Sequence, residues 1–217
     1  MCEYVATDSS KVHRNSDFAS YNKEVVWNLI DGAPYCHVSA TVNGRPYIQP
    51  TVHWREDEKL YIHGALKNKM IKAIVKGAEA AIAFTHFDAY IMTASAINHG
   101  VSYRSATMFA KGRGILDLDE KERALRLFIE RLSPGRWATI RPPTQDELKM
   151  TGVVEFPIQE VSAKIMMQGD QVLWVLPGGK YEIAEDKDIN AWTGVYPYTL
   201  MRKDPLTTEE LRLCGDA

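Results

Sequence analysis

An alternating segment that ends in Asn43-Gly44 constrains the fold of this chain more than any other feature. From Tyr35 onward polar and apolar residues alternate, so every second side chain lies on one face of an extended strand. Asparagine and glycine both tolerate the positive φ angles of a two-residue hairpin turn, which predicts a return strand over Arg45–Trp54. A charged turn then leads into a third strand, Leu60–His63. Connections this short join antiparallel strands, since a parallel crossover needs about a dozen residues.

Helices and further strands follow the same kinds of signal. Helical spacing of apolar residues predicts helices over residues 15–31 and 67–76. Capping-box spacing predicts a helix over residues 119–132 opened by Asp119 and Glu122, and a short helix opened by Thr144 and Glu147. Strands are expected over residues 80–85, 89–93, 107–116 and 153–167, with Pro157 marking a bulge or an edge. The chain shows no repeat and no linker. We therefore expect one α+β domain over residues 1–217, with its core over about residues 15–200, built on an antiparallel sheet or barrel.

Composition narrows the class of protein. The 217 residues are 45% hydrophobic, enough for a sizeable core, and the formal net charge of −2 argues against a nucleic-acid partner. No apolar run is long enough for a membrane span, and the polar N-terminus lacks a signal-peptide core. Three widely spaced cysteines argue against a disulfide framework or a zinc site. These features predict a reduced, cytoplasmic, soluble protein without a metal.

The segment Leu60–Ala73, LYIHGALKNKMIKA, carries the clearest chemical signal. It combines a short buried strand, a glycine break and a helix that opens among Lys67, Asn68 and Lys69. Two ammonium groups and the free N–H groups of a helix start suit a phosphate. A solvated helix start is the alternative interpretation.

A second polar segment, ASAINHGVSYRSA, separates two apolar strands. Its donors include His99, Tyr103, Ser105 and the guanidinium of Arg104, which can hold a phosphate bidentately. An ordinary surface loop is the alternative.

Other site patterns are weaker. A metal pair at His53 and His63 lacks an HxH or HExxH motif, and a Ser95, His99 and Asp88 triad lacks a GxSxG elbow. Neither GxGxxG nor a P-loop occurs. Several aromatic residues could stack on a flat ring or simply fill the core: Tyr47, Trp54, Tyr61, Trp174, Trp192 and Tyr196.

Taken in order, five segments between Tyr35 and Pro197 resemble the FMN-binding split-barrel superfamily. They are HVSATVNGRPYIQPTVHW, LYIHGALKNKMIKAI, SAINHGVSYRSATMFAKGRG, LSPGRWATIRPPTQDELKMT and WTGVYP. That superfamily includes pyridoxamine 5′-phosphate oxidase and the nitroimidazole-resistance flavoproteins, and the chain is most similar to its flavin-nucleotide-binding branch. The resemblance implies an antiparallel split β-barrel with flanking helices, a homodimer, and FMN at the dimer interface.

The resemblance also implies where FMN would lie. Gln49, Pro50, Thr51 and Val52 would follow the flavin ring edge, and His63, Gly64 and Ala65 the ribityl side. Lys67, Asn68 and Lys69 would meet the phosphate, with Lys69 the best match to the family's basic ligand. Tyr103, Arg104 and Ser105 would add contacts from the facing subunit, and Trp192 would lie near the flavin.

The implied function is an FMN-dependent oxidoreductase that uses NAD(P)H and a small electron acceptor. His63 or His99 could protonate a reduced product, because histidine titrates near neutral pH. QPTVHW replaces the oxidase's Arg-rich strand and its C-terminal Arg/His pattern is missing, so oxidation of pyridoxamine 5′-phosphate is not expected. The alternatives are a flavin carrier or sensor without turnover, and a split barrel that binds haem or deazaflavin.

Overall fold

The computed structural model describes residues 2–168, 171–172 and 194–198, which form an α+β fold with two main antiparallel sheets. The larger sheet has the order β1-β10-β7-β6-β2-β3, with β13 paired to β6. Its strands are β1 (Ala19–Ser20), β2 (Cys36–Val42), β3 (Arg45–Thr51), β6 (Glu79–Met92), β7 (Gly100–Lys111), β10 (Glu160–Ile165) and β13 (Gly194–Pro197). The α+β prediction is confirmed for these residues.

A four-stranded sheet of order β4-β5-β9-β8 completes the fold. Its strands are β4 (His53–Glu56), β5 (Lys59–Ala65), β8 (Arg113–Gly114) and β9 (Thr151–Pro157), and a separate ribbon joins β11 (Met167–Gln168) to β12 (Gln171–Val172). The helices of the described part are α1 (Lys23–Gly32), α2 (Lys69–Val75), α3 (Leu118–Leu132) and α4 (Gln145–Met150). Short 3₁₀ segments occupy 16–18, 96–98 and 137–139.

One core joins the two sheets, in agreement with a split barrel. Ile30 of α1, Ile74 of α2, Phe84 of β6 and Phe156 of β9 are fully buried in the same cluster. Gly112 permits this approach, because a Cβ there would lie 2.5 Å from Val154 and 2.7 Å from Phe156. A smaller cluster lies between α3 and the four-stranded sheet.

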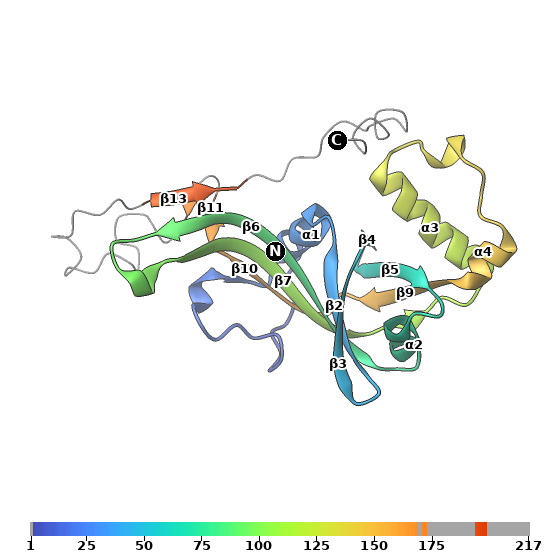
Figure 1. The fold of residues 1–217 in the computed structure, drawn as a ribbon, viewed down its shortest axis with the longest axis horizontal. Helices are drawn as coiled ribbons and strands as arrows, with labels where there is room; N and C mark the ends of the chain where they lie inside the picture. Colours follow the sequence, from blue (N-terminus) through green and yellow to red (C-terminus); the bar gives the residue numbers. More distant parts are fainter. Residues whose placement is uncertain (1, 169–170, 173–193, 199–217) are drawn as a thin grey trace, which may run out of the picture.

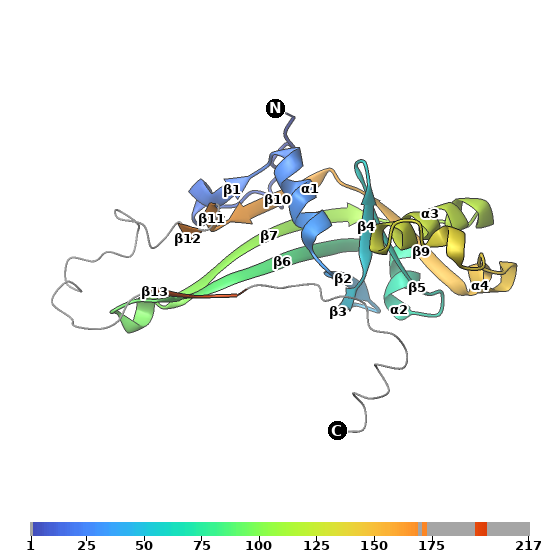
Figure 2. The same cartoon turned by 90° about the horizontal axis from the view of Figure 1, so that it is seen from above.

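The molecule has two distinct ends. Beyond the register shift at Phe87/Ala89, β6 and β7 continue as a long curved hairpin, residues 87–103, which we call the arm (Figure 1). Both views place the arm at one end of the molecule and α3 with α4 at the other (Figure 2). No helix of the described residues is long and apolar enough to cross a bilayer.

The turn at Asn43-Gly44 and the cap at Thr144 are confirmed, whereas the cap at Asp119 is not. Asn43 and Gly44 have φ angles of 52° and 75°, as a two-residue hairpin turn requires. Thr144 and Glu147 form a reciprocal capping box at the start of α4. At α3 the predicted cap at Asp119 is wrong, since the Asp117 side chain accepts from the N–H of Glu120.

Several predicted boundaries are wrong for tertiary reasons. Segment 45–54 divides between β3 and β4, and segment 153–167 divides between β9, β10 and the start of β11; in each case the strands belong to different sheets. Conversely, the predicted strands 80–85 and 89–93 are one strand, because a bulge at Asp88 lets the pairing continue. The helix expected from residue 15 begins at Lys23, after a 3₁₀ turn and a short strand.

Candidate functional site

A side-chain hydrogen bond ties the edge strand β3 to the start of α2. Asn68 Nδ2 donates to Gln49 Oε1 at 2.9 Å, and both residues are half-buried. The backbone N–H of Asn68 donates to the carbonyl of Ala65 at 2.8 Å, which closes the turn that leaves β5. The structure thus brings together two of the segments expected to follow a flavin, the end of β3 and the junction between β5 and α2.

Asn68 also caps α2, and this changes the expected phosphate site. Its Oδ1 accepts from the N–H groups of Met70 at 2.8 Å and Ile71 at 3.3 Å. Those two amides are therefore already used, so the expectation of several free helix-start N–H groups is wrong here. The available donors are the exposed ammonium groups of Lys67 and Lys69, which form no ion pair with another described residue.

An exposed apolar surface adjoins these lysines. Along β3 and just after it, Tyr47, Ile48 and Val52 are exposed, Ile48 to 66%. Pro50 and the half-buried Thr51 lie between them in the same edge strand, and Gly64 and Ala65 end β5. The ammonium groups of the two lysines suit a phosphate, and the exposed apolar side chains of β3 suit a planar ring. The residues present therefore fit a ligand that combines a planar ring with a phosphate.

His63 lies on the side of β5 that faces α3. Its ring centroid is 5.0 Å from that of Phe128 on α3 and 5.7 Å from that of Trp54 on β4. The Nδ1 of His63 and the Nε1 of Trp54 are buried and have no protein partner among the described residues. Burial lowers the pKa of His63, so the imidazole is neutral near pH 7. The neutral His63 side chain can therefore accept a hydrogen bond or coordinate a metal, and it does not contribute a positive charge.

His53 lies on the opposite face of the same ribbon. It pairs in register with Ile62, the neighbour of His63, and adjacent residues of a strand point to opposite faces. Its Nε2 is 2.7 Å from the carbonyl oxygen of Ile30, and burial lowers its pKa. The two histidines therefore do not form a metal pair. No cluster of three or more His, Cys, Asp or Glu residues in the described ranges could hold a metal ion.

The predicted polar loop is partly strand. Tyr103, Arg104 and Ser105 lie in β7, where Arg104 pairs in register with His86 and Ile165. The Arg104 guanidinium contacts the carboxylate of Asp88, with Nη2 to Oδ1 at 2.8 Å and Nε to Oδ2 at 3.1 Å. Strands β6 and β2 separate β7 from β3, about 14 Å at ordinary strand spacing. Within one chain these residues do not meet Gln49.

The remaining predicted residues are not part of this site. His99 is exposed near the tip of the arm, where its Nδ1 is 3.1 Å from the backbone oxygen of Ser95. Asp88 is bound to Arg104 and is 7% exposed, so the Ser95, His99 and Asp88 triad is wrong. Trp174 and Trp192 lie outside the described residues.

Sequence reasoning missed one buried cation. Lys121 of α3 is only 4% exposed and shares a helix face with Ala124 and Phe128. A lysine at an apolar position of an amphipathic helix is the signal that could have identified it.

A family model described as pyridoxamine 5′-phosphate oxidase matches residues 22–165. The chain belongs to the pyridoxamine 5′-phosphate oxidase family. The matched range includes the end of β3, the turn from β5 into α2, His63 and the arm. Among curated proteins, none matches this chain.

Solved structures give more specific likenesses. The flavocytochrome Anf3 from Azotobacter vinelandii is 28% identical with a TM-score of 0.80, over 93% of this chain and 90% of that one. The FAD and heme binding protein from Mycobacterium smegmatis is 29% identical with a TM-score of 0.77, over 88% and 89%. A protein from Bacteroides thetaiotaomicron named for 5-nitroimidazole antibiotic resistance is 20% identical with a TM-score of 0.58, over 68% and 86%, and supports the fold alone.

Proposed function

We propose that this protein binds a flavin nucleotide beside β3 and the start of α2 and acts as a redox protein. The observation that carries the proposal is the Gln49–Asn68 bond, which places an exposed apolar strand next to two exposed lysines. Lys69 and Lys67 would hold the phosphate by charge-assisted contacts, and Gln49 would lie at the ring edge. Membership of a family with flavin-binding members supports this assignment.

The chain's own residues would bind, orient and shield the cofactor. The bound flavin supplies hydride and electron transfer. Tyr47, Ile48 and Val52 would add apolar contacts to the cofactor, because they are apolar and exposed. FMN is the cofactor that the family resemblance implies, whereas the Mycobacterium smegmatis protein is described as binding FAD and heme. We propose NAD(P)H as the electron donor and a small molecule as the acceptor.

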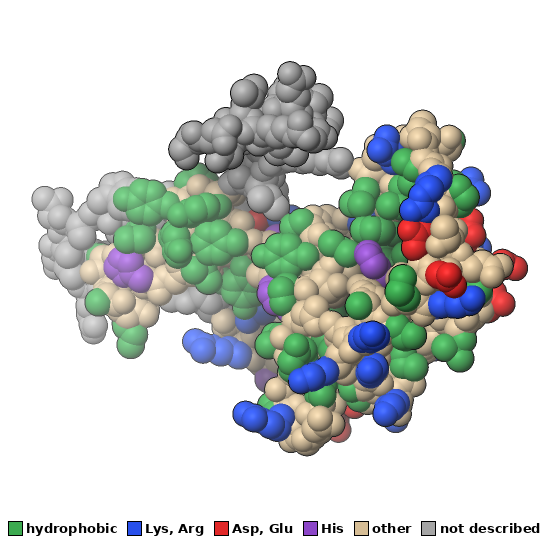
Figure 3. Space-filling view, turned by 45° about the vertical axis from the view of Figure 1, so that its right-hand side comes forward, with side chains coloured by type: hydrophobic (Ala, Val, Ile, Leu, Met, Phe, Trp, Pro, Cys, Tyr) green, Lys and Arg blue, Asp and Glu red, His purple; other side chains and the backbone are tan. Residues whose placement is uncertain are grey.

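A homodimer would complete the site. Tyr103, Arg104 and Ser105 are too far across the sheet to reach the flavin of their own chain, so a second copy would have to present them. Exposed apolar side chains on the arm and on β13 offer a surface for that copy: Phe87, Tyr90, Val101 and Tyr196. Figure 3 shows apolar side chains gathered over the arm, whereas Lys and Arg side chains are scattered over the rest of the face shown. Sedimentation tests this: a monomer that still binds flavin tightly would contradict the proposal.

The ligand experiment is direct. We expect purified protein to be yellow, with flavin absorbance bands, and heat to release FMN or FAD that chromatography and mass spectrometry distinguish. Mixing the anaerobic protein with NADH or NADPH should bleach the flavin bands, and a small acceptor should restore them. A colourless protein that takes up neither flavin would refute the function. A yellow protein that neither nucleotide reduces would favour a carrier or sensor.

Heme binding is a second candidate, favoured by the surroundings of His63. A neutral imidazole with an unpartnered Nδ1, set between Trp54 and Phe128, offers a nitrogen ligand for heme iron among aromatic neighbours. The two relatives near 28–29% identity are described as a flavocytochrome and as a FAD and heme binding protein. Reconstitution with hemin should give a Soret band that the variant His63→Phe lacks and His13→Gln retains. Equal bands in both variants would exclude His63.

A further inference from the structure

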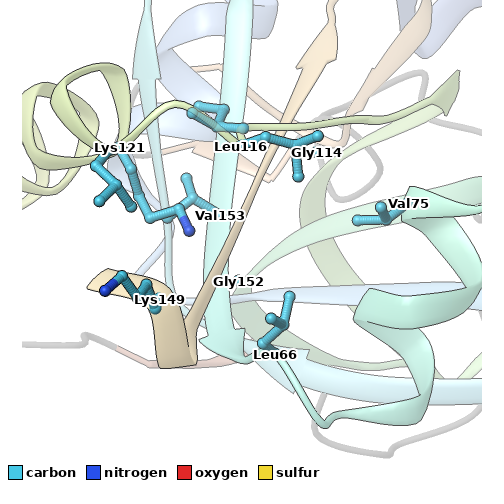
Figure 4. A pocket seen from close by; sticks show the side chains of 10 residues that line it. Leu66, Val75, Gly114, Leu116, Lys121, Lys149, Gly152 and Val153 are labelled. Carbon is cyan, nitrogen blue, oxygen red and sulfur yellow. The ribbon is translucent and has the colours of Figure 1, made fainter. Parts of the chain in front are cut away.

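A small apolar pocket lies between α2, the start of α3, α4 and the edge of the four-stranded sheet. Its volume is about 200 Å³. Leu66 and Val75 line it from the α2 side, Leu116 from the segment before α3, and Val153 from β9 (Figure 4). Neither the flavin proposal nor the heme proposal uses this pocket.

Lys121 of α3 contributes a buried ammonium group to this pocket. Figure 4 shows the Lys121 nitrogen reaching towards the strand that carries Val153. The side chain is 4% exposed, and Nζ donates to the backbone carbonyl of Leu148 at 2.9 Å. An ammonium group has three donors, and no described carboxylate forms an ion pair with Lys121.

The neighbouring lysine makes the contrast clear. Lys149 of α4 also lines the pocket, but its ammonium is exposed and lies 3.3 Å from the Asp146 carboxylate. The ammonium of Lys149 is stabilised by water and by Asp146. The ammonium of Lys121 is buried without a counter-ion, which is unfavourable. Burial alone lowers the pKa of Lys121, with no acidic neighbour acting against it. A negative group in the pocket would supply the missing partner.

We propose that this pocket binds a small monocarboxylate with an apolar tail, whose carboxylate pairs with Lys121. One buried ammonium matches a single negative charge, and the apolar lining matches a hydrocarbon tail better than a sugar or a nucleotide. The volume is below the roughly 300–1,000 Å³ of sites for drug-sized ligands, so the ligand has few heavy atoms. This inference does not rest on the proposed flavin site.

Hexanoate is the probe, and the chain's methyl groups report where it binds. In methyl-labelled full-length protein, titrated hexanoate should shift the methyl resonances of Val75 and Val153. The methyl groups of Ile48, exposed on β3, should not shift. Hexanamide has the same tail without the charge and should bind at least about tenfold more weakly. Equal binding of hexanamide, shifts elsewhere, or displacement of hexanoate by added flavin would overturn the proposal.

Substitution of Lys121 supplies an independent test. Lys121→Met approximately keeps the length of the side chain and removes its charge, and should weaken the binding of hexanoate by about tenfold or more. Lys11→Met, which removes an exposed lysine of the N-terminal segment outside the pocket lining, should leave hexanoate affinity unchanged. Unchanged hexanoate affinity in Lys121→Met would overturn the proposal. If that variant does not fold, the hexanoate and hexanamide titrations of the unmodified protein decide the question.

Discussion

Asn68 Nδ2 donates to Gln49 Oε1 at 2.9 Å, while Asn68 Oδ1 accepts from the first amides of α2. One side chain therefore fixes the position of the helix start and of the edge strand together. The proposed flavin site depends on this link, because it sets the distance between the phosphate-binding lysines and the ring-binding strand.

Replacement of Asn68 should separate its two roles. Asn68→Ala removes the cap and the link, and we expect a loss of about 1–2 kcal/mol in the free energy of unfolding. The melting temperature should fall by roughly 2–8 °C, followed by circular dichroism. Asn68→Asp retains the capping oxygen but not the amide donor and should stay within about 0.5 kcal/mol of the unmodified protein. Equal destabilisation in both variants would show that the cap contributes little.

Lys69→Ala should weaken flavin binding more than Lys67→Ala does. Loss of a charge-assisted bond to a phosphate corresponds to about 1.5–3 kcal/mol, or about a 10- to 150-fold rise in Kd. Fluorescence quenching of FMN and of FAD, titrated into apoprotein, measures the change. Lys111→Ala removes an exposed lysine of β7 remote from this site and serves as the matched control. Identical Kd values for all of these proteins would remove the phosphate assignment.

The ion pair between Asp88 and Arg104 should stabilise the base of the arm. Arg104→Met leaves a carboxylate that is 7% exposed without its guanidinium, and the free energy of unfolding should fall by about 1–3 kcal/mol. This loss is smaller than for a fully buried ion pair, because the Arg104 side chain is 41% exposed and solvent weakens its interaction with Asp88.

The double variant Asp88→Asn with Arg104→Met tests whether the two groups are coupled. Its loss of stability in urea unfolding should be smaller than the sum of the two single losses. As a control, Lys149→Ala breaks an exposed pair and should change stability by less than about 0.5 kcal/mol. Strict additivity at Asp88 and Arg104 would contradict the coupling.

Acid should destabilise the fold through His53, which is buried, and His63, which is half-buried. Burial lowers the pKa of His53 and of His63 in the folded state, so the unfolded chain binds protons first. The contribution of these two histidines to the free energy of unfolding is therefore fully present above about pH 6.5. Below that pH it declines, by up to about 1.4 kcal/mol per pH unit for each histidine.

His63→Phe should reduce this pH dependence. The Nδ1 of His63 has no described partner to lose, and the site is already aromatic. Urea unfolding at pH 7.5, 6.5 and 5.5 measures the slope, and the exposed His13→Gln provides the control. A slope in His63→Phe equal to that of the unmodified protein would show that another group senses the acid.

The sequence by itself determined the local elements and the family. The period of two before Asn43-Gly44, the capping box at Thr144 and the basic strand-to-helix junction depend on residues close together in the chain. Such short-range signals depend little on tertiary context, and so the hairpin of β2 and β3, α4 and α2 lie close to where they were predicted. The position of Lys69 beside a strand end could be predicted for the same reason.

Only the tertiary structure decided which strands share a sheet and which side chains meet. An extended segment has the same period in either sheet, so the transfer after Thr51 leaves no local signal, and Pro157 marked an irregularity in the strand but not the change of sheet. The Gln49–Asn68 bond, the Asp88–Arg104 pair and the burial of Lys121 all join residues 16 or more positions apart. Contacts at that separation form only when the whole core packs, and the details of the candidate sites depend on them.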